Sequence, residues 1–172
     1  MAKILGRLGT LLVGVSLGVW GLELPSNFSA HFNQVIYGDN GKKLTYTGEV
    51  YFRNNQVYWH YSYPTEKMIW VNQGRFVVYE PDLMQVTIAK PKKNINFLKL
   101  IKTARKIAPH RYTTKVEGRE YNFTYTGTLQ KVQYRDKIGN LVVITFSHQS
   151  TQPQSDALFK PHFPPDVDII YR

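Results

Sequence analysis

The sequence predicts a mainly β protein of a single domain, with about ten strands in a continuous antiparallel meander and one helical insertion. Apolar and polar residues alternate with period two along most of the chain after residue 27, and turn residues separate these runs. Only one segment of this region has helical spacing. A chain of 172 residues can bury one hydrophobic core, and it has no cysteine for disulfides, thiolate metal sites or nucleophiles.

Six strands are expected before the helical segment, and turn signals separate them. In the first, Phe28, Ala30 and Phe32 alternate with polar residues, and Asp39-Asn40-Gly41 then forms a turn. The expected ranges are 28–36, 44–53, 57–63, 67–71, 75–79 and 84–89. The same pattern predicts later strands at 111–116, 120–125, 129–135, 141–148 and 167–171.

One segment, residues 94–108, has helical rather than strand periodicity. Its apolar residues recur every three or four positions, with lysines between them. Asn94 or Asn96 can cap its start and Pro109 stops it. The segment therefore predicts an amphipathic helix whose charges lie opposite its apolar stripe.

The first 21 residues have the pattern of a secretory signal peptide. Lys3 and Arg7 form a basic start, and an apolar stretch without acidic residues follows over 8–20. Cleavage is expected after Gly21 or Gly18, and cleavage after Gly21 leaves residues 22–172 as the single β domain. An uncleaved N-terminal anchor is the rival interpretation, although the stretch is shorter than the roughly 20 residues of a membrane span.

The composition weighs against catalysis and nucleic-acid binding. None of the five histidines has metal-ligand spacing, and nucleophile and phosphate-loop motifs are missing, so we expect no enzyme, metal or cofactor. The strand aromatics alternate with Thr, Ser and Asn rather than with Lys and Arg, which disfavours a nucleic-acid platform.

The net charge is +10, and basic residues concentrate at positions 90–106. This cluster could meet an acidic partner or anionic headgroups, or it could be a solvated helix face.

The apolar faces of the strands need a cover that the sequence barely supplies. Of the 24 aromatic residues, 13 lie between Phe28 and Tyr79. A second sheet packed on the first would give an ordinary sandwich core, and an open sheet would give an aromatic-lined concavity. The pattern alone leaves both open.

Several sequence motifs occur in an order that is typical of one known protein family. They are Asn27-Phe28-Ser29-Ala30-His31-Phe32-Asn33-Gln34-Val35, Gly48-Glu49-Val50-Tyr51-Phe52-Arg53 with Trp59-His60-Tyr61 and Tyr63-Pro64, and Val78-Tyr79-Glu80-Pro81-Asp82-Leu83-Met84-Gln85-Val86-Thr87. Residues 141–146 and 163–170 also fit. Over most of 27–171 the chain resembles the LolA family, the periplasmic lipoprotein carriers of Gram-negative bacteria.

The resemblance implies an unclosed antiparallel β half-barrel whose concave apolar face lies under a short helical lid. It implies a monomeric periplasmic chaperone that shields lipoprotein acyl chains between the inner and outer membranes. The implied partners are acylated lipoproteins, an inner-membrane ATP-driven releasing complex and, in many species, an outer-membrane receptor. A periplasmic lipid-binding sensor with the same half-barrel, or an esterase acting on a bound lipid, stays open.

Candidate site residues follow from the strand pattern and the resemblance. The expected cavity wall is Phe28, Phe32, Val50, Phe52, Trp59, Tyr61, Ile69, Val71, Val77, Tyr79, Val86 and Ile88, although a one-residue register error would exchange the two strand faces. The lid candidates are Phe97, Leu98, Ile101 and Ile107. Arg53 matches a family arginine that resembles a latch, which donates hydrogen bonds to backbone carbonyls of the lid. Without that match, the position is interpreted as an exposed arginine at a strand end.

The N-terminus departs from the family pattern. The family has a helix between the signal and the first strand, whereas cleavage after Gly21 leaves only residues 22–26 there. Either this chain lacks that helix, and part of the cavity is uncovered, or the N-terminal segment is retained and supplies it.

Overall fold

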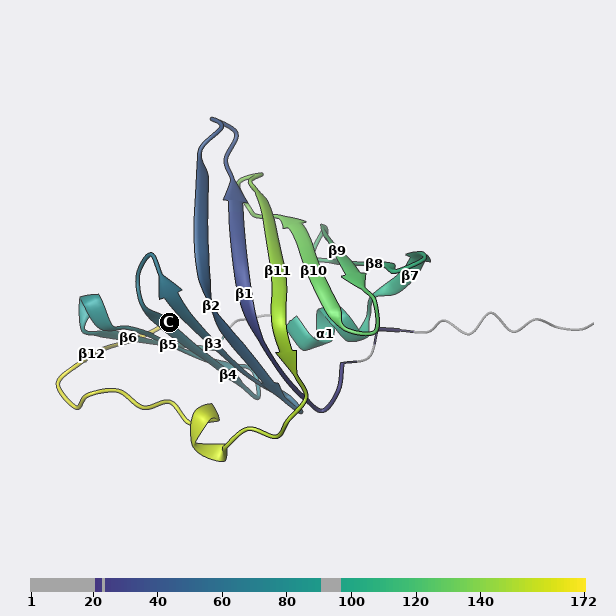
Figure 1. Cartoon of the computed structure of the whole chain (residues 1–172). Helices are drawn as coiled ribbons and strands as arrows, with labels where there is room; N and C mark the ends of the chain where they lie inside the picture. The colour runs from purple at the N-terminus through teal and green to yellow at the C-terminus, as the bar shows by residue number, and fades with distance from the viewer. Residues whose placement is uncertain (1–20, 23, 91–96) are drawn as a thin grey trace, which may run out of the picture.

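A computed structural model describes residues 21–22, 24–90 and 97–172 (Figure 1). The strands are β1 (Asn27–Tyr37), β2 (Lys43–Arg53), β3 (Gln56–Tyr63), β4 (Lys67–Asn72), β5 (Arg75–Glu80), β6 (Gln85–Ala89), β7 (Arg105–Ala108), β8 (Arg111–Val116), β9 (Arg119–Tyr125), β10 (Leu129–Arg135), β11 (Leu141–Ser150) and β12 (Asp168–Tyr171). The helices are α1 (Phe97–Lys102) and the short 3₁₀ turns η1 (Pro81–Leu83) and η2 (Asp156–Phe159). The mainly β prediction is confirmed.

All of these strands form one unclosed sheet, in the order β12-β6-β5-β4-β3-β2-β1-β11-β10-β9-β8-β7. The prediction of a continuous meander is wrong in two places. β1 lies in the middle, antiparallel to both β2 and β11, because the chain crosses from β6 to the opposite edge before β7. The last strand, β12, returns to β6 and pairs with it in parallel.

The predicted 94–108 helix is correct only in its middle. Within the described residues α1 ends at Lys102, where the Thr103 hydroxyl donates to the carbonyls of Lys99 and Leu100. Residues 105–108 instead form β7 on the edge of β8. Backbone pairing with the edge of the sheet therefore overrides the helical spacing of these residues. The predicted cap residues Asn94 and Asn96 lie outside the described residues.

The sheet buries apolar side chains on both of its faces. Along β4, Ile69 and Val71 join one buried cluster, whereas Met68 and Trp70 join the other, because successive side chains of a strand point to opposite faces. We call the first the helix face, because α1 packs into it, and the second the outer face. Figure 1 shows α1 against one side of the sheet and the yellow C-terminal segment against the other.

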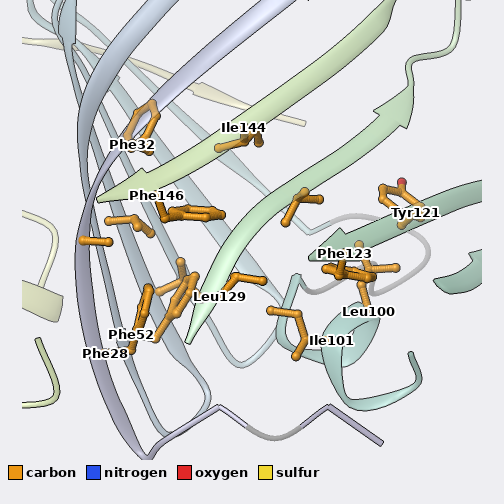
Figure 2. Packing of buried hydrophobic residues seen from close by; sticks show 14 of the residues in the cluster. Phe28, Phe32, Phe52, Leu100, Ile101, Tyr121, Phe123, Leu129, Ile144 and Phe146 are labelled. Carbon is orange, nitrogen blue, oxygen red and sulfur yellow. The ribbon is translucent and has the colours of Figure 1, made fainter. Parts of the chain in front are cut away.

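The helix face holds the larger cluster. Curved strands surround the rings of Phe28, Phe52 and Phe146, and Leu100 and Ile101 of α1 fill the space beside Phe123 (Figure 2). The outer-face cluster is smaller and lies beneath Phe159, Leu158 and Phe163 of the C-terminal segment.

The expected signal peptide lies almost wholly outside the described residues and stays a prediction. Across the ranges that the structure describes, none of the helices has the length and apolar character needed to span a membrane.

Candidate functional site

Eight of the predicted wall residues share the helix face: Phe28, Phe32, Val50, Phe52, Trp59, Tyr61, Ile69 and Val71. Their aromatic rings form a continuous surface. The Phe28 and Phe52 rings stack with centroids 5.5 Å apart, and the Phe32 ring meets Trp59 edge-on at 5.0 Å. These residues come from β1 to β4, and the pairing register of these strands keeps them on one face.

The other four, Val77, Tyr79, Val86 and Ile88, lie on the outer face, so the structure does not bring them to the same wall. Val77 is paired with Trp70 and Tyr79 with Met68, both of which are outer-face residues. On β5 it is Phe76 that packs on the helix face. Both faces of β5 are apolar, so alternation there carries no information about which one is concave.

A cavity of about 180 Å³ remains between the wall and the helix. Its lining is wholly apolar or aromatic: Val57, Trp59, Tyr61, Ile69, Val71, Phe76 and Phe97. Sites for small molecules usually enclose about 300–1,000 Å³. Among the described residues, the space between the wall and Phe97 is therefore smaller than a site for a small molecule usually is.

Phe97 is the side chain through which α1 closes this cavity. Its ring centroid lies 5.5 Å from that of Phe52 and 5.8 Å from that of Trp59. The lid candidate Ile101 is buried against the wall, and so is Leu100, which was not among the candidates. Ile107 lies on edge strand β7 and is 53% exposed, and the Leu98 side chain is outside what the structure describes.

Few polar groups enter this face. The Tyr61 hydroxyl donates to the Gln34 side-chain carbonyl at 3.2 Å, and burial raises the pKa of Tyr61. Across the described residues there is no cluster of His, Cys, Asp and Glu able to hold a metal ion. The arrangement suits apolar, non-directional contact with a flexible ligand.

Comparison with known proteins decides the family. The family model described as outer membrane lipoprotein carrier protein LolA matches residues 25–116. Among curated relatives, an outer-membrane lipoprotein carrier protein from Helicobacter pylori strain J99 is 34% identical over 135 residues, covering 77% of this chain and 72% of the relative. The chain belongs to the LolA family. A Campylobacter jejuni protein of the same name is 28% identical, with 88% of this chain and 91% of that protein covered.

The fold has solved counterparts at much lower sequence identity. An uncharacterised conserved protein from Thermus thermophilus has a TM-score of 0.56 at 10% identity, covering 87% of this chain and 92% of that one. This likeness supports the open, curved sheet of the LolA fold and nothing finer.

Arg53 is placed differently from what the LolA resemblance implies. It follows Phe52 in β2 and therefore points to the outer face, away from α1. Among the described residues, its guanidinium donates to the Gln56 side-chain oxygen, pairs with Asp156, and lies over the Phe159 ring. These contacts hold the C-terminal segment rather than the helix.

The N-terminal segment of this LolA chain covers part of the helix face. Leu22 is buried and Leu24 half-buried on the helix face, and Gly21 forms a β-bridge with Arg105 at the sheet edge. A pocket of about 660 Å³ opens between this segment, Phe52, Ile101 and the β2–β3 turn. The described residues of this segment form no helix, whereas the LolA resemblance implies one before the first strand, and an opening remains beside α1.

Proposed function

We propose that this chain is a periplasmic carrier that shelters the acyl chains of lipoproteins against its helix face. The observation that carries the proposal is the apolar cavity lined by Phe97 and by the aromatic wall of an unclosed sheet. Among the described residues, the six-residue helix α1 and the side chains of Leu22 and Leu24 pack over this face. The curated relatives bear the name of outer-membrane lipoprotein carriers, which agrees with this use of the face.

The energetics suit a carrier. Burial of an acyl chain contributes ~0.8 kcal/mol per methylene, so one long chain contributes on the order of 10 kcal/mol. The cavity of about 180 Å³ lies below the range of small-molecule sites, so loading requires Phe97 and α1 to withdraw from Phe52 and Trp59. Closure of α1 over the wall then favours release, because the helix and the cargo compete for the same apolar surface.

The proposed partners follow from that role. The chain would receive triacylated lipoproteins from an ATP-driven complex of the inner membrane and deliver them to the outer membrane, as a monomer. Contacts between acyl chains and apolar walls lack direction, so cargoes with different protein parts can share the site.

Mass spectrometry of the tagged chain purified from periplasm tests the proposal. We expect co-purified triacylated lipoprotein. Recovery of only free fatty acid or deacylated product would contradict it and favour a lipid-cleaving enzyme. Depletion of the chain in its native bacterium should leave lipoproteins in the inner membrane, whereas loss of a lipid sensor would leave their distribution unchanged.

A further inference from the structure

The charge of this protein is concentrated in one stretch. No acidic residue occurs between Asp82 and Glu117, although nine of the 22 Lys and Arg residues fall there. The other 13 basic residues nearly balance the 12 acids. Almost the whole net charge of +10 thus belongs to a segment of the chain that builds β6, α1, β7 and β8.

The fold exposes these charges together at the β7 edge of the sheet. The side chains of Lys99, Lys102, Arg105, Lys106, Arg111 and Lys115 are all exposed, and none has an ion-pair partner among the described residues. We call these six residues the basic edge. Figure 1 shows α1, β7 and β8 at one side of the molecule, and the Thr103 hydroxyl contacts that of Thr114 at 3.0 Å.

The pairing register keeps like charges close. Arg105 is opposite Thr113, so Arg111 and Lys115, two positions to either side, are its diagonal neighbours. Diagonal side chains on adjacent strands are roughly 7–8 Å apart, where unpaired like charges repel. Such an arrangement weakens the isolated fold and becomes favourable when an anionic surface supplies the counter-charge.

Two features favour a lipid surface over an acidic protein. Ile107 is 53% exposed within the basic edge, between Lys106 and the β7–β8 turn, so an apolar side chain projects among cations. Lys102 also lines the pocket formed by Leu22, Leu24 and Ile101, beside the cover of the cavity. A cation of the basic edge thus stands at an opening beside the helix face.

We propose that the basic edge docks the chain on membranes rich in anionic phospholipid, with Ile107 inserted among the headgroups. Membrane docking itself does not depend on the proposed function. Only its purpose does: docking would hold the opening against the bilayer while a lipoprotein is transferred. Each cation near an anionic bilayer strengthens binding roughly fivefold, and the attraction weakens as salt rises.

Flotation of the full chain with vesicles tests the docking. We expect binding to phosphatidylcholine vesicles that contain phosphatidylglycerol, little binding to pure phosphatidylcholine, and much weaker binding at high salt. Arg105→Glu with Lys106→Glu should weaken binding by roughly 30-fold or more. Lys137→Glu with Lys160→Glu, an equal charge change at exposed sites outside the basic edge, should weaken it far less. Ile107→Ser should reduce binding that persists at high salt.

The outcomes separate docking from cargo binding. Both double variants should bind a triacylated lipopeptide in solution as the unmodified chain does, because none of these four side chains lines the cavity. Equal flotation of the two double variants, or equal flotation with both kinds of vesicle, would overturn the docking surface. Flotation that requires an acidic protein embedded in the vesicle would assign the edge to a protein partner and also overturn it. If the unmodified chain does not bind the lipopeptide, that result would instead count against the proposed function.

Discussion

The guanidinium of Arg53 lies over the ring of Phe159, 4.5 Å from its centroid, and also pairs with Asp156. Arg53→Leu removes this cation–π contact and the hydrogen bonds to Gln56, so we expect the free energy of unfolding to fall by about 1–2 kcal/mol. Hydrogen exchange should accelerate over residues 155–163, where the C-terminal segment covers Trp70. Asp156→Ala is the matched control: its side chain is 82% exposed, so its loss should cost less than about 1 kcal/mol.

The same variant tests the latch that the resemblance implies. That role predicts that Arg53→Leu loads cargo but transfers it poorly to an acceptor. The contacts to the C-terminal segment predict faster exchange there with transfer intact. A transfer assay beside the exchange measurement separates the two, because only the latch makes release depend on Arg53.

Gly48 is required by a close approach between β2 and β3. A Cβ at this position would lie 1.9 Å from the His60 carbonyl oxygen, at a register shift in the ladder. Gly48→Ala therefore forces backbone apart, and we expect it to lower the free energy of unfolding by about 2–3 kcal/mol in urea titration. At Gly38 a Cβ would chiefly meet the Asn40 side chain at 3.1 Å, so Gly38→Ala should cost under about 1 kcal/mol. Equal losses would show that the strands separate freely at Gly48.

Most strands could be predicted from the sequence because period-two alternation and turn residues are local signals. β7 could not be predicted, because its four residues continue the helical spacing of the segment before them. They form a strand because they pair with β8. Nor could the central place of β1 be predicted, since it depends on long-range pairing with β11.

Alternation groups the side chains of one strand by face, but it does not say which face is concave. On β1, polar residues separate Phe28 and Phe32, and both lie on the helix face. β3, β4 and β5 carry apolar or aromatic side chains on both faces, so alternation there could not say which set faces the helix. On β6, Val86 and Ile88 alternate with polar Thr87, yet they belong to the outer face, because the pattern does not say which side of the sheet is concave. Leu158, Phe159 and Phe163, which cover the second face, stand in an irregular segment with no periodicity to reveal them. Alternation itself places Arg53 opposite in direction to its neighbour Phe52, so one regular strand cannot direct both side chains into the cavity.

Buried tyrosines make stability sensitive to alkaline pH. Burial, followed by a hydrogen bond to Glu49, raises the pKa of Tyr51 to about 12, and burial raises that of Tyr61 further. Unfolded tyrosines ionise near pH 10. The folded state thus holds these protons more tightly, so its stability is intact below about pH 10 and falls as pH rises through 12. Urea midpoints should drop over this window and drop less steeply in Tyr61→Phe. Tyr171→Phe, at a side chain 73% exposed, should keep the original slope.

Val71 and Val77 distinguish the two faces of the sheet as ligand sites. They occupy adjacent strands and are almost equally buried, but Val71 lines the cavity and Val77 packs on the outer face. Val71→Phe fills space that an acyl chain needs, so we expect a triacylated lipopeptide to bind roughly tenfold more weakly or worse. Val77→Phe overpacks the outer face and should cost a comparable 1–3 kcal/mol of stability, yet leave binding within about twofold.

Denaturation and lipopeptide titration on both variants give the decision. Similar stability losses with unequal binding place the acyl chain on the helix face, since general destabilisation would weaken both variants alike. Weaker binding by Val77→Phe alone would show that the acyl chain binds on the outer face, beneath the C-terminal segment. Arg53, which contacts that segment, would then help to keep the cargo bound.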